Sequence, residues 1–168
     1  ALARAGIGKL ILIDFDRVDI TNLHRQQYKA DQIGMYKTVA LAENLKEIAP
    51  YISLEIHTER ITEDNVLTLL KDADIICEAF DDAECKAMLT EIVLTEMRDK
   101  YLVAASGMAG LYDANRIKTR KIMSKFYLCG DEVSDVAEGI GLVSSRVMVC
   151  AAHQAHTVLR ILANNFEE

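Results

Sequence analysis

Asp14 and Asp16 follow the first apolar run of the chain, where a nucleotide-binding sheet would use them. The run Lys9–Ile13 is continuous and apolar, which predicts a strand buried on both faces. An acid at the end of such a strand can accept hydrogen bonds from ribose hydroxyls. A solvated strand end or a helix cap would use the same residues, so both interpretations stay open.

A second polar group lies in the segment Asn22–Tyr28, with Lys37 further along the chain. Arg25 offers a planar fork that can hold phosphate oxygens, and Lys37 adds a point charge. A phosphoryl centre under attack needs such charge neutralisation. An exposed loop with ordinary surface charges would explain the same residues, and we favour that interpretation for His24.

A third polar group, Glu78–Asp82, follows another apolar run. A carboxylate at this point can hold Mg²⁺ against a triphosphate. Asp81 or Asp82 can instead cap the helix that follows, so that one acid binds the metal while the other caps. The small-residue turn Ser106–Gly110 would let a backbone or a peptide tail approach closely, or it is a tight turn without a partner.

The elements that must position these groups alternate between strand and helix. Apolar patterns predict strands at 9–14, 52–56, 74–79 and 101–105. Helical spacing predicts helices at about 31–48, 66–70, 83–97 and 143–162. Such alternation implies a parallel sheet whose ligands bind at the carboxyl ends of the strands. We therefore expect an α/β fold, a Rossmann-like and mostly parallel sheet flanked by helices, with a less regular C-terminal part.

Length, charge and cysteine usage exclude several classes of protein. The 168 residues suffice for one domain, and the net charge of −7 argues against nucleic-acid binding. The four cysteines form no C-x-x-C pair, so no zinc is expected. Charged and polar residues interrupt the most apolar long stretch, 141–163, which argues against a membrane span. No secretory segment opens the chain, so a cytoplasmic protein is predicted.

Taken together, these motifs resemble those of the ThiF and MoeB family, bacterial relatives of the ubiquitin-activating enzymes. The similarity lies in Asp14-Phe15-Asp16, Asn22-Leu23-His24-Arg25-Gln26, Gly34 with Lys37, and Phe80-Asp81, in this order and spacing. The similarity covers residues 1–168 as a single adenylating domain. The chain is most similar to a short ThiF subgroup that lacks the zinc-binding cysteines.

The resemblance implies ATP-dependent adenylation of the C-terminal Gly-Gly carboxylate of a ubiquitin-like, ThiS-like sulfur carrier protein. Thiamine biosynthesis is the expected setting, a homodimer the expected assembly, and ATP with Mg²⁺ the expected cofactors. By this resemblance Asp14 holds the ribose, Asp81 binds Mg²⁺, the phosphates are held by Asn22, Arg25 and Lys37, and supporting roles fall to Asp16 and Gln26. Arg25, Lys37 and Asp81 are the expected catalytic residues.

The start of the chain departs from the family pattern. Ala1–Gly6 has the composition of a helix end stopped by glycine, so the family's first strand and glycine-rich phosphate loop are expected before Ala1. The fragment alone is therefore expected to be inactive. Two alternatives are a non-catalytic binding module for a ubiquitin-like partner and an NAD-dependent oxidoreductase. Hydride transfer to or from NAD requires neither Arg25 and Lys37 beside the nucleotide phosphates nor an acid at Asp81. The oxidoreductase therefore explains these residues less well than adenylation does.

Overall fold

The computed structural model describes residues 1–137 and 139–164. It divides into two compact units, Ala1–Thr62 and Glu63–Glu168, and each unit is described by itself. In the described part of the chain, no helix has the length and apolar character needed to cross a membrane.

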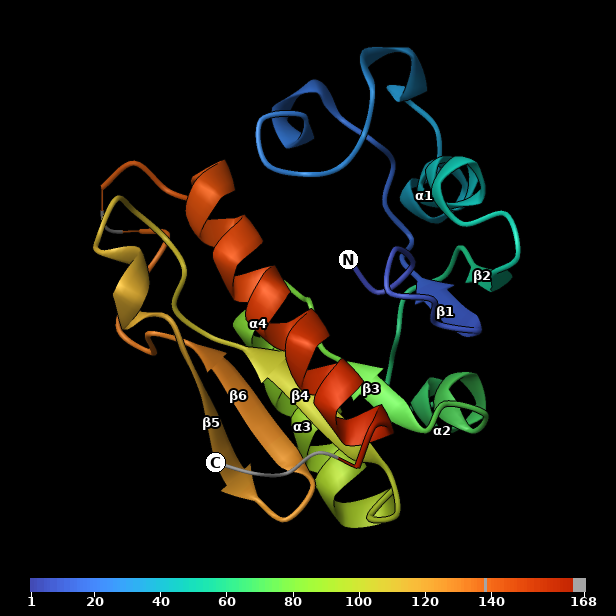
Figure 1. The fold of residues 1–168 in the computed structure, drawn as a ribbon, viewed down its shortest axis with the longest axis vertical. Coiled ribbons are helices and arrows are strands. Elements are labelled where there is room, and N and C mark those ends of the chain that lie inside the picture. The colour runs from blue at the N-terminus through green and yellow to red at the C-terminus, as the bar shows by residue number, and fades with distance from the viewer. Residues whose placement is uncertain (138, 165–168) are drawn as a thin grey trace. The chain divides into compact units, whose positions relative to one another are not determined.

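The first unit is a pair of parallel strands connected through a helix (Figure 1). Strand β1 (Lys9–Ile13) pairs with β2 (Ser53–His57) over its whole length. Helix α1 (Lys37–Ile48) lies between them in the chain and packs on β2. Short 3₁₀ turns occupy Ile20–Asn22 and Ala30–Gln32, in the long connection that leads from β1 to α1.

Helix α1 begins at Lys37, later than the predicted start near Asp31. The cause is a turn at Gly34, whose φ of +88° lies in the left-handed region that favours glycine. The Gly34 N–H donates to the carbonyl of Val18, 2.8 Å away, and so ties this turn to a segment far back in the chain. Sequence periodicity does not report such a long-range bond, which explains the error.

The second unit contains most of the regular structure of the chain (Figure 1). Its elements in chain order are α2 (Val66–Leu70), β3 (Ile75–Cys77), α3 (Ala83–Glu96), β4 (Tyr101–Ala105), a 3₁₀ turn at Ala114–Arg116, β5 (Lys118–Met123), β6 (Phe126–Gly130) and α4 (Ser144–Leu162). The predicted strand and helix at 101–105 and 143–162 therefore agree with the structure within one residue.

These strands form one sheet in the order β3-β4-β6-β5. Strands β3, β4 and β6 run parallel, whereas β5 pairs antiparallel with β6. Helix α4 crosses one face of the sheet and α3 lies against the other (Figure 1). The α/β prediction is confirmed, and the antiparallel β5–β6 hairpin is the less regular C-terminal part.

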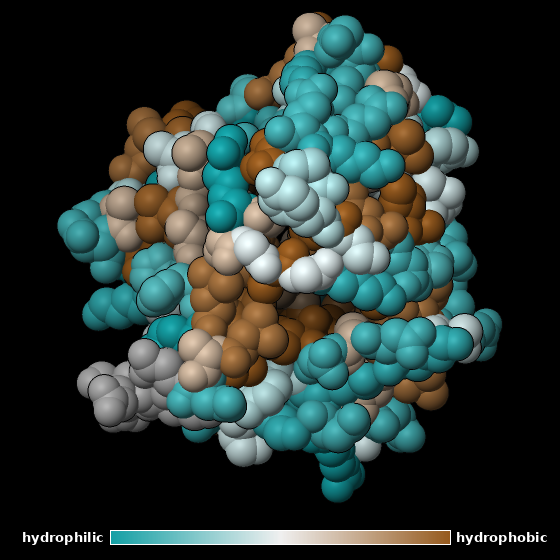
Figure 2. Space-filling model, turned by 45° about the vertical axis from the view of Figure 1, so that its right-hand side comes forward, coloured by the Kyte–Doolittle hydropathy of each residue, from teal (hydrophilic) through white to brown (hydrophobic). Residues whose placement is uncertain are grey.

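Apolar side chains of β4 form the centre of this core. Leu102 and Val103 are fully buried because helices cover both faces of their strand, and Val93 of α3 and Val158 of α4 are nearly so. Burial of each such side chain stabilises the fold by about 1.5 to 3 kcal/mol. Hydrophilic and hydrophobic residues lie side by side on the surface that Figure 2 shows. Exposed apolar residues of this kind are normal in globular proteins.

Candidate nucleotide-binding site

In the first unit, Lys37 lies close to both carboxylates that follow β1. Its Nζ is 2.8 Å from Oδ2 of Asp16 and 3.9 Å from Oδ2 of Asp14. Only 12% of the Lys37 side chain is exposed, whereas the Asp14 side chain is 37% exposed and the Asp16 side chain 47%. The structure thus brings together three of the residues predicted to hold the nucleotide, at the carboxyl end of a parallel strand.

The backbone fixes this arrangement from two sides. The Lys37 N–H donates to the carbonyl of Asp16 over 2.9 Å, which holds the start of α1 beside the end of β1. The Asp16 N–H in turn donates to Oδ1 of Asp14 at 2.8 Å. Both acids are therefore held in place without using all of their oxygens, and the remaining lone pairs can accept from a ribose.

Tyr28 is a member of this cluster that the sequence did not single out. Burial and the neighbouring carboxylates of Asp14 and Asp16 raise the pKa of Tyr28 to about 12. The phenol consequently stays protonated near neutral pH and remains a hydrogen-bond donor. The sequence indicates a place for Tyr28 near Asp14 and Asp16 only through its membership in the Asn22–Tyr28 segment. An aromatic residue in a loop rarely predicts a position beside two carboxylates.

The segment that contains Asn22 and Arg25 is held by local hydrogen bonds. The buried Asn22 accepts the Asp19 N–H at 3.0 Å through Oδ1, while Asp19 accepts from Thr21, so that the two side chains form a capping box. Nη1 of Arg25 donates to the Thr21 carbonyl at 2.7 Å. Arg25 and Gln26 are half-buried, and the Arg25 guanidinium has further N–H groups for phosphate oxygens.

A buried pair of amides anchors this loop to α1. Nε2 of Gln32 donates to Oδ1 of Asn44 at 2.9 Å, and Nδ2 of Asn44 donates back to Oε1 of Gln32 at 3.0 Å. Asn44 also donates to the carbonyl of Gln27 at 3.0 Å. This pair was not predicted from the sequence, where two amides in an otherwise amphipathic segment were the only signal of it.

In the second unit, the structure shows which of the two acids after β3, Asp81 or Asp82, caps helix α3. Oδ1 of Asp82 accepts the Cys85 N–H at 2.8 Å and caps α3. Asp81 is exposed, and among residues 1–137 and 139–164 its carboxylate has no hydrogen-bonding or ionic partner. The described residues hold no group of three or more His, Cys, Asp or Glu side chains around a metal position. An exposed carboxylate still fits Mg²⁺, which usually takes one or two protein carboxylates and completes its shell with phosphates and water.

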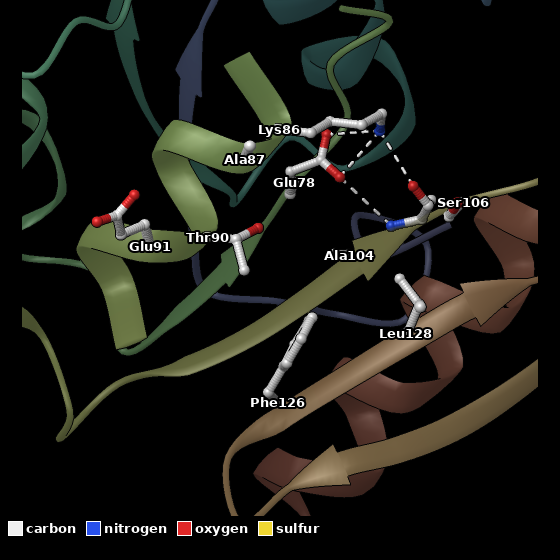
Figure 3. Close-up of a pocket in the computed structure, with 10 residues that line it drawn as sticks. Glu78, Lys86, Ala87, Thr90, Glu91, Ala104, Ser106, Phe126 and Leu128 are labelled. Atoms are coloured by element: carbon white, nitrogen blue, oxygen red, sulfur yellow. Dashed lines mark hydrogen bonds and ion pairs between the residues drawn. The ribbon is translucent and has the colours of Figure 1, made fainter. Parts of the chain in front are cut away.

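The buried Glu78, which lies three residues before Asp81 in the chain, forms an ion pair with the half-buried Lys86. Nζ of Lys86 donates to both carboxylate oxygens of Glu78, at 2.8 Å and 2.9 Å, and to the carbonyl of Ala105 at 3.0 Å. Only 1% of the Glu78 side chain is exposed. Figure 3 shows the two side chains joined to each other and, by further hydrogen bonds, to the end of β4. No role for Glu78 could be predicted from the sequence, because its pairing with Lys86 depends on how α3 folds back over the strand.

The ion pair lies at the edge of an open cavity of about 410 Å³. Its lining residues come from α3, the end of β4 and β6, and include Thr90, Ser106, Phe126 and Leu128 (Figure 3). The adjoining glycine turn packs closely on the loop after β6, since a Cβ on Gly107 would overlap Oδ1 of Asp131. The close backbone approach predicted for this turn is therefore made by the chain itself.

Cys129 is buried in this unit. Burial raises the pKa of its thiol above the ordinary value of 9.0, although hydrogen bonds from Thr119 and Thr157 act in the opposite direction. A thiol in this state is mostly protonated near neutral pH and is a poor nucleophile.

The chain thus has an α/β fold in which polar side chains follow the carboxyl ends of parallel strands. A family model described as "ThiF family" matches residues 1–168, and the chain belongs to this family. Among curated proteins, the adenylyltransferase and sulfurtransferase MOCS3 of Dictyostelium discoideum is 28% identical over 99% of this chain and 40% of its own length. The protein of the same name from Caenorhabditis briggsae is 33% identical over 54% of this chain and 23% of its own length. The chain thus spans less than half the length of these relatives.

Solved structures show the same fold at lower identity. The E. coli tRNA N6-threonylcarbamoyladenosine dehydratase TcdA in complex with ATP has a TM-score of 0.78 at 23% identity, over 96% of this chain and 80% of that one. E. coli MccB in its complex with succinimide has a TM-score of 0.73 at 21% identity, over 98% of this chain and 51% of that one. These similarities confirm the Rossmann-like fold.

Proposed function

We propose that this chain is the adenylating part of an enzyme that activates the C-terminal carboxylate of a ubiquitin-like sulfur carrier protein with ATP. The observation that carries the proposal is the cluster of Lys37 with Asp14 and Asp16 at the carboxyl end of β1. ThiF family membership supports it. Further support comes from curated relatives named as adenylyltransferases and from a TcdA structure with bound ATP.

In the proposed reaction, a carboxylate oxygen of the carrier forms a bond to the α-phosphorus of ATP. The bond from this phosphorus to the bridging oxygen breaks, so that pyrophosphate leaves and an acyl-adenylate remains. The chain would orient the ribose through Asp14 and neutralise phosphate charge through Arg25 and Lys37. Asn22, Gln26 and Asp16 would support them. Mg²⁺ held by Asp81 would supply charge neutralisation on the triphosphate.

Lys37 is suited to this task because its charge is already compensated by two carboxylates. A phosphate oxygen can replace a carboxylate oxygen as its partner at little cost, since one ionic hydrogen bond is exchanged for another. The exposed Asp16 can then return to water, where its charge is well solvated. We further propose thiamine-type sulfur transfer as the setting and a homodimer as the working assembly, both from the family resemblance.

ATP–pyrophosphate exchange that depends on a ThiS-like carrier tests this function in the full-length protein. Arg25→Ala and Asp81→Ala should each abolish exchange while the circular dichroism spectrum and melting temperature stay unchanged. Asp72→Ala, which removes another exposed acid of the second unit, is the matched control and should keep full exchange. Full activity of Asp81→Ala would contradict the site assignment.

The other outcomes separate the alternatives. Carrier binding without exchange in the full-length protein would indicate a non-catalytic binding module. An absorbance change that requires NAD would instead indicate an oxidoreductase. Exchange without any carrier would show that a different carboxylate is activated.

A further inference from the structure

The turn that carries Asp81 is fixed on both of its sides. Before Asp81, the Phe80 N–H donates to Oε1 of Glu78 at 2.6 Å. After Asp81, Asp82 caps α3 through the Cys85 N–H. The chain between these two points is short, so the direction of the Asp81 carboxylate depends on where Glu78 and the start of α3 lie.

Glu78 is itself held from three directions. Lys86 of α3 binds both of its carboxylate oxygens, and the same Nζ binds the carbonyl of Ala105 at the end of β4. From α4, Nε2 of Gln154 donates to the backbone carbonyl of Glu78 at 2.9 Å. All three N–H groups of the Lys86 ammonium are therefore used within the protein, and none is left to bind a ligand.

Burial of the Glu78 carboxylate is costly unless the carboxylate is fully hydrogen-bonded, because its charge leaves water, whereas 27% of the Lys86 side chain stays exposed. Apolar residues of similar volume at these positions could stabilise the sheet at least as well. What apolar residues could not supply is an acceptor for the Phe80 N–H and an ionic link from α3 to the strand ends.

We infer that Glu78 and Lys86 are positioning residues that orient Asp81 toward the metal of the nucleotide complex. This inference rests on the proposed function, since it assumes that Asp81 holds Mg²⁺. Neither residue touches the substrate; both act through the turn that carries Asp81. Partners that orient a metal ligand typically contribute about 10-fold to 100-fold in metal affinity.

The test measures metal affinity without turnover. The full-length protein is titrated with Mn²⁺ in place of Mg²⁺, in the presence of a non-hydrolysable ATP analogue. Electron paramagnetic resonance then measures the concentration of free Mn²⁺. Lys86→Ala should weaken Mn²⁺ binding by about 10-fold to 100-fold, and Glu78→Gln should weaken it in the same direction. Lys86→Arg should retain much of the affinity, because a guanidinium can still reach the carboxylate. Lys71→Ala, which removes an exposed lysine, is the matched control and should change nothing.

The open cavity permits a second and sharper measurement. Lys86 lines this cavity of about 410 Å³, so its truncation to alanine leaves a space that small solutes can enter. Propylammonium should therefore restore Mn²⁺ affinity to Lys86→Ala but not to Glu78→Gln, which has lost the negative charge.

Three results decide the inference. Folded Lys86→Ala and Glu78→Gln with unchanged Mn²⁺ affinity would overturn it while leaving the proposed function intact. Unchanged Mn²⁺ affinity in Asp81→Ala would show instead that the assumed metal site is wrong, and the inference would fall with it. If Lys86→Ala does not fold, Glu78→Gln, which keeps the shape of the side chain, decides the question alone.

Discussion

The buried ion pair between Asp131 and Arg146 leads to a prediction whose sign and size follow from the structure. Nη2 of Arg146 lies 2.7 Å from Oδ2 of Asp131, and the two side chains are only 3% and 2% exposed. Oδ1 of Asp131 accepts from the N–H groups of Val133 and Ser134 and from the Ser134 hydroxyl. In contrast, Nε and Nη1 of Arg146 have no hydrogen-bond partner within residues 1–137 and 139–164.

This asymmetry predicts that the two partners are not equally costly to replace. Asp131→Asn leaves a buried guanidinium without a counter-charge, which costs about 3 to 5 kcal/mol. Arg146→Met removes two unpartnered donors and leaves Asp131 with its three other hydrogen bonds, so we expect a smaller loss of about 1 to 3 kcal/mol. Asp131→Asn should therefore lower the free energy of unfolding more than Arg146→Met does.

The acid dependence gives an independent measure of the same pair. Burial opposes the ionisation of Asp131, but hydrogen bonds from Ser134, Val133 and Arg146 outweigh it and lower its pKa from 3.8 to about 2. At about 1.36 kcal/mol per pKa unit, this shift corresponds to roughly 2 kcal/mol. Because the folded-state pKa is depressed, that stability is present above the unfolded-state value and is lost as the pH falls through the folded-state value.

Urea unfolding of the wild type, Asp131→Asn, Arg146→Met and the double variant provides the assay. The difference in free energy of unfolding between wild type and Asp131→Asn should be largest near neutral pH and should shrink by roughly 2 kcal/mol toward pH 2. The double variant should recover part of the loss of Asp131→Asn. A larger loss in Arg146→Met than in Asp131→Asn, or a difference that is independent of pH, would refute the reasoning.

Three further substitutions test other parts of the structure. Asp82→Ala removes the cap of α3 and should lower the free energy of unfolding in urea by about 1 kcal/mol, whereas Asp81→Ala should leave it unchanged. Gly107→Ala forces a side chain into a left-handed residue with φ +77° and should lower the melting temperature, at a cost of about 1 to 3 kcal/mol. Asn44→Leu leaves the buried Gln32 without its amide partner and should cost about 1 to 3 kcal/mol, with faster hydrogen exchange in the preceding loop as the direct readout.

The sequence predicted best those elements whose limits depend on local residues. The strand at 101–105 is an apolar run bounded by Lys100 and Ser106, so its ends are visible in the sequence. Helix α1 was placed too early because its true start depends on Gly34 and on a hydrogen bond to Val18. A local pattern cannot contain that information.

The same distinction applies to the candidate site. Asp14, Asp16 and Lys37 could be predicted as candidates because strand ends and residue types are visible in the sequence, and the structure brings the three side chains together. Glu78 was missed because its importance depends on Lys86, which reaches it only once α3 has folded back over the sheet. The roles of Asp14, Asp16 and Lys37 in nucleotide binding remain predictions, as do the roles assigned to Asn22, Arg25, Gln26 and Asp81.

The reciprocal amides of Gln32 and Asn44 anchor the loop that carries Arg25 through uncharged groups. Both groups are neutral, so neither pH near neutrality nor added salt alters the bonds between them. The ionic contacts of Lys37, by contrast, respond to salt and to any anion that approaches. The loop that carries Arg25 can therefore keep its position while the ionic partners around it are exchanged, as binding and release of a triphosphate would require.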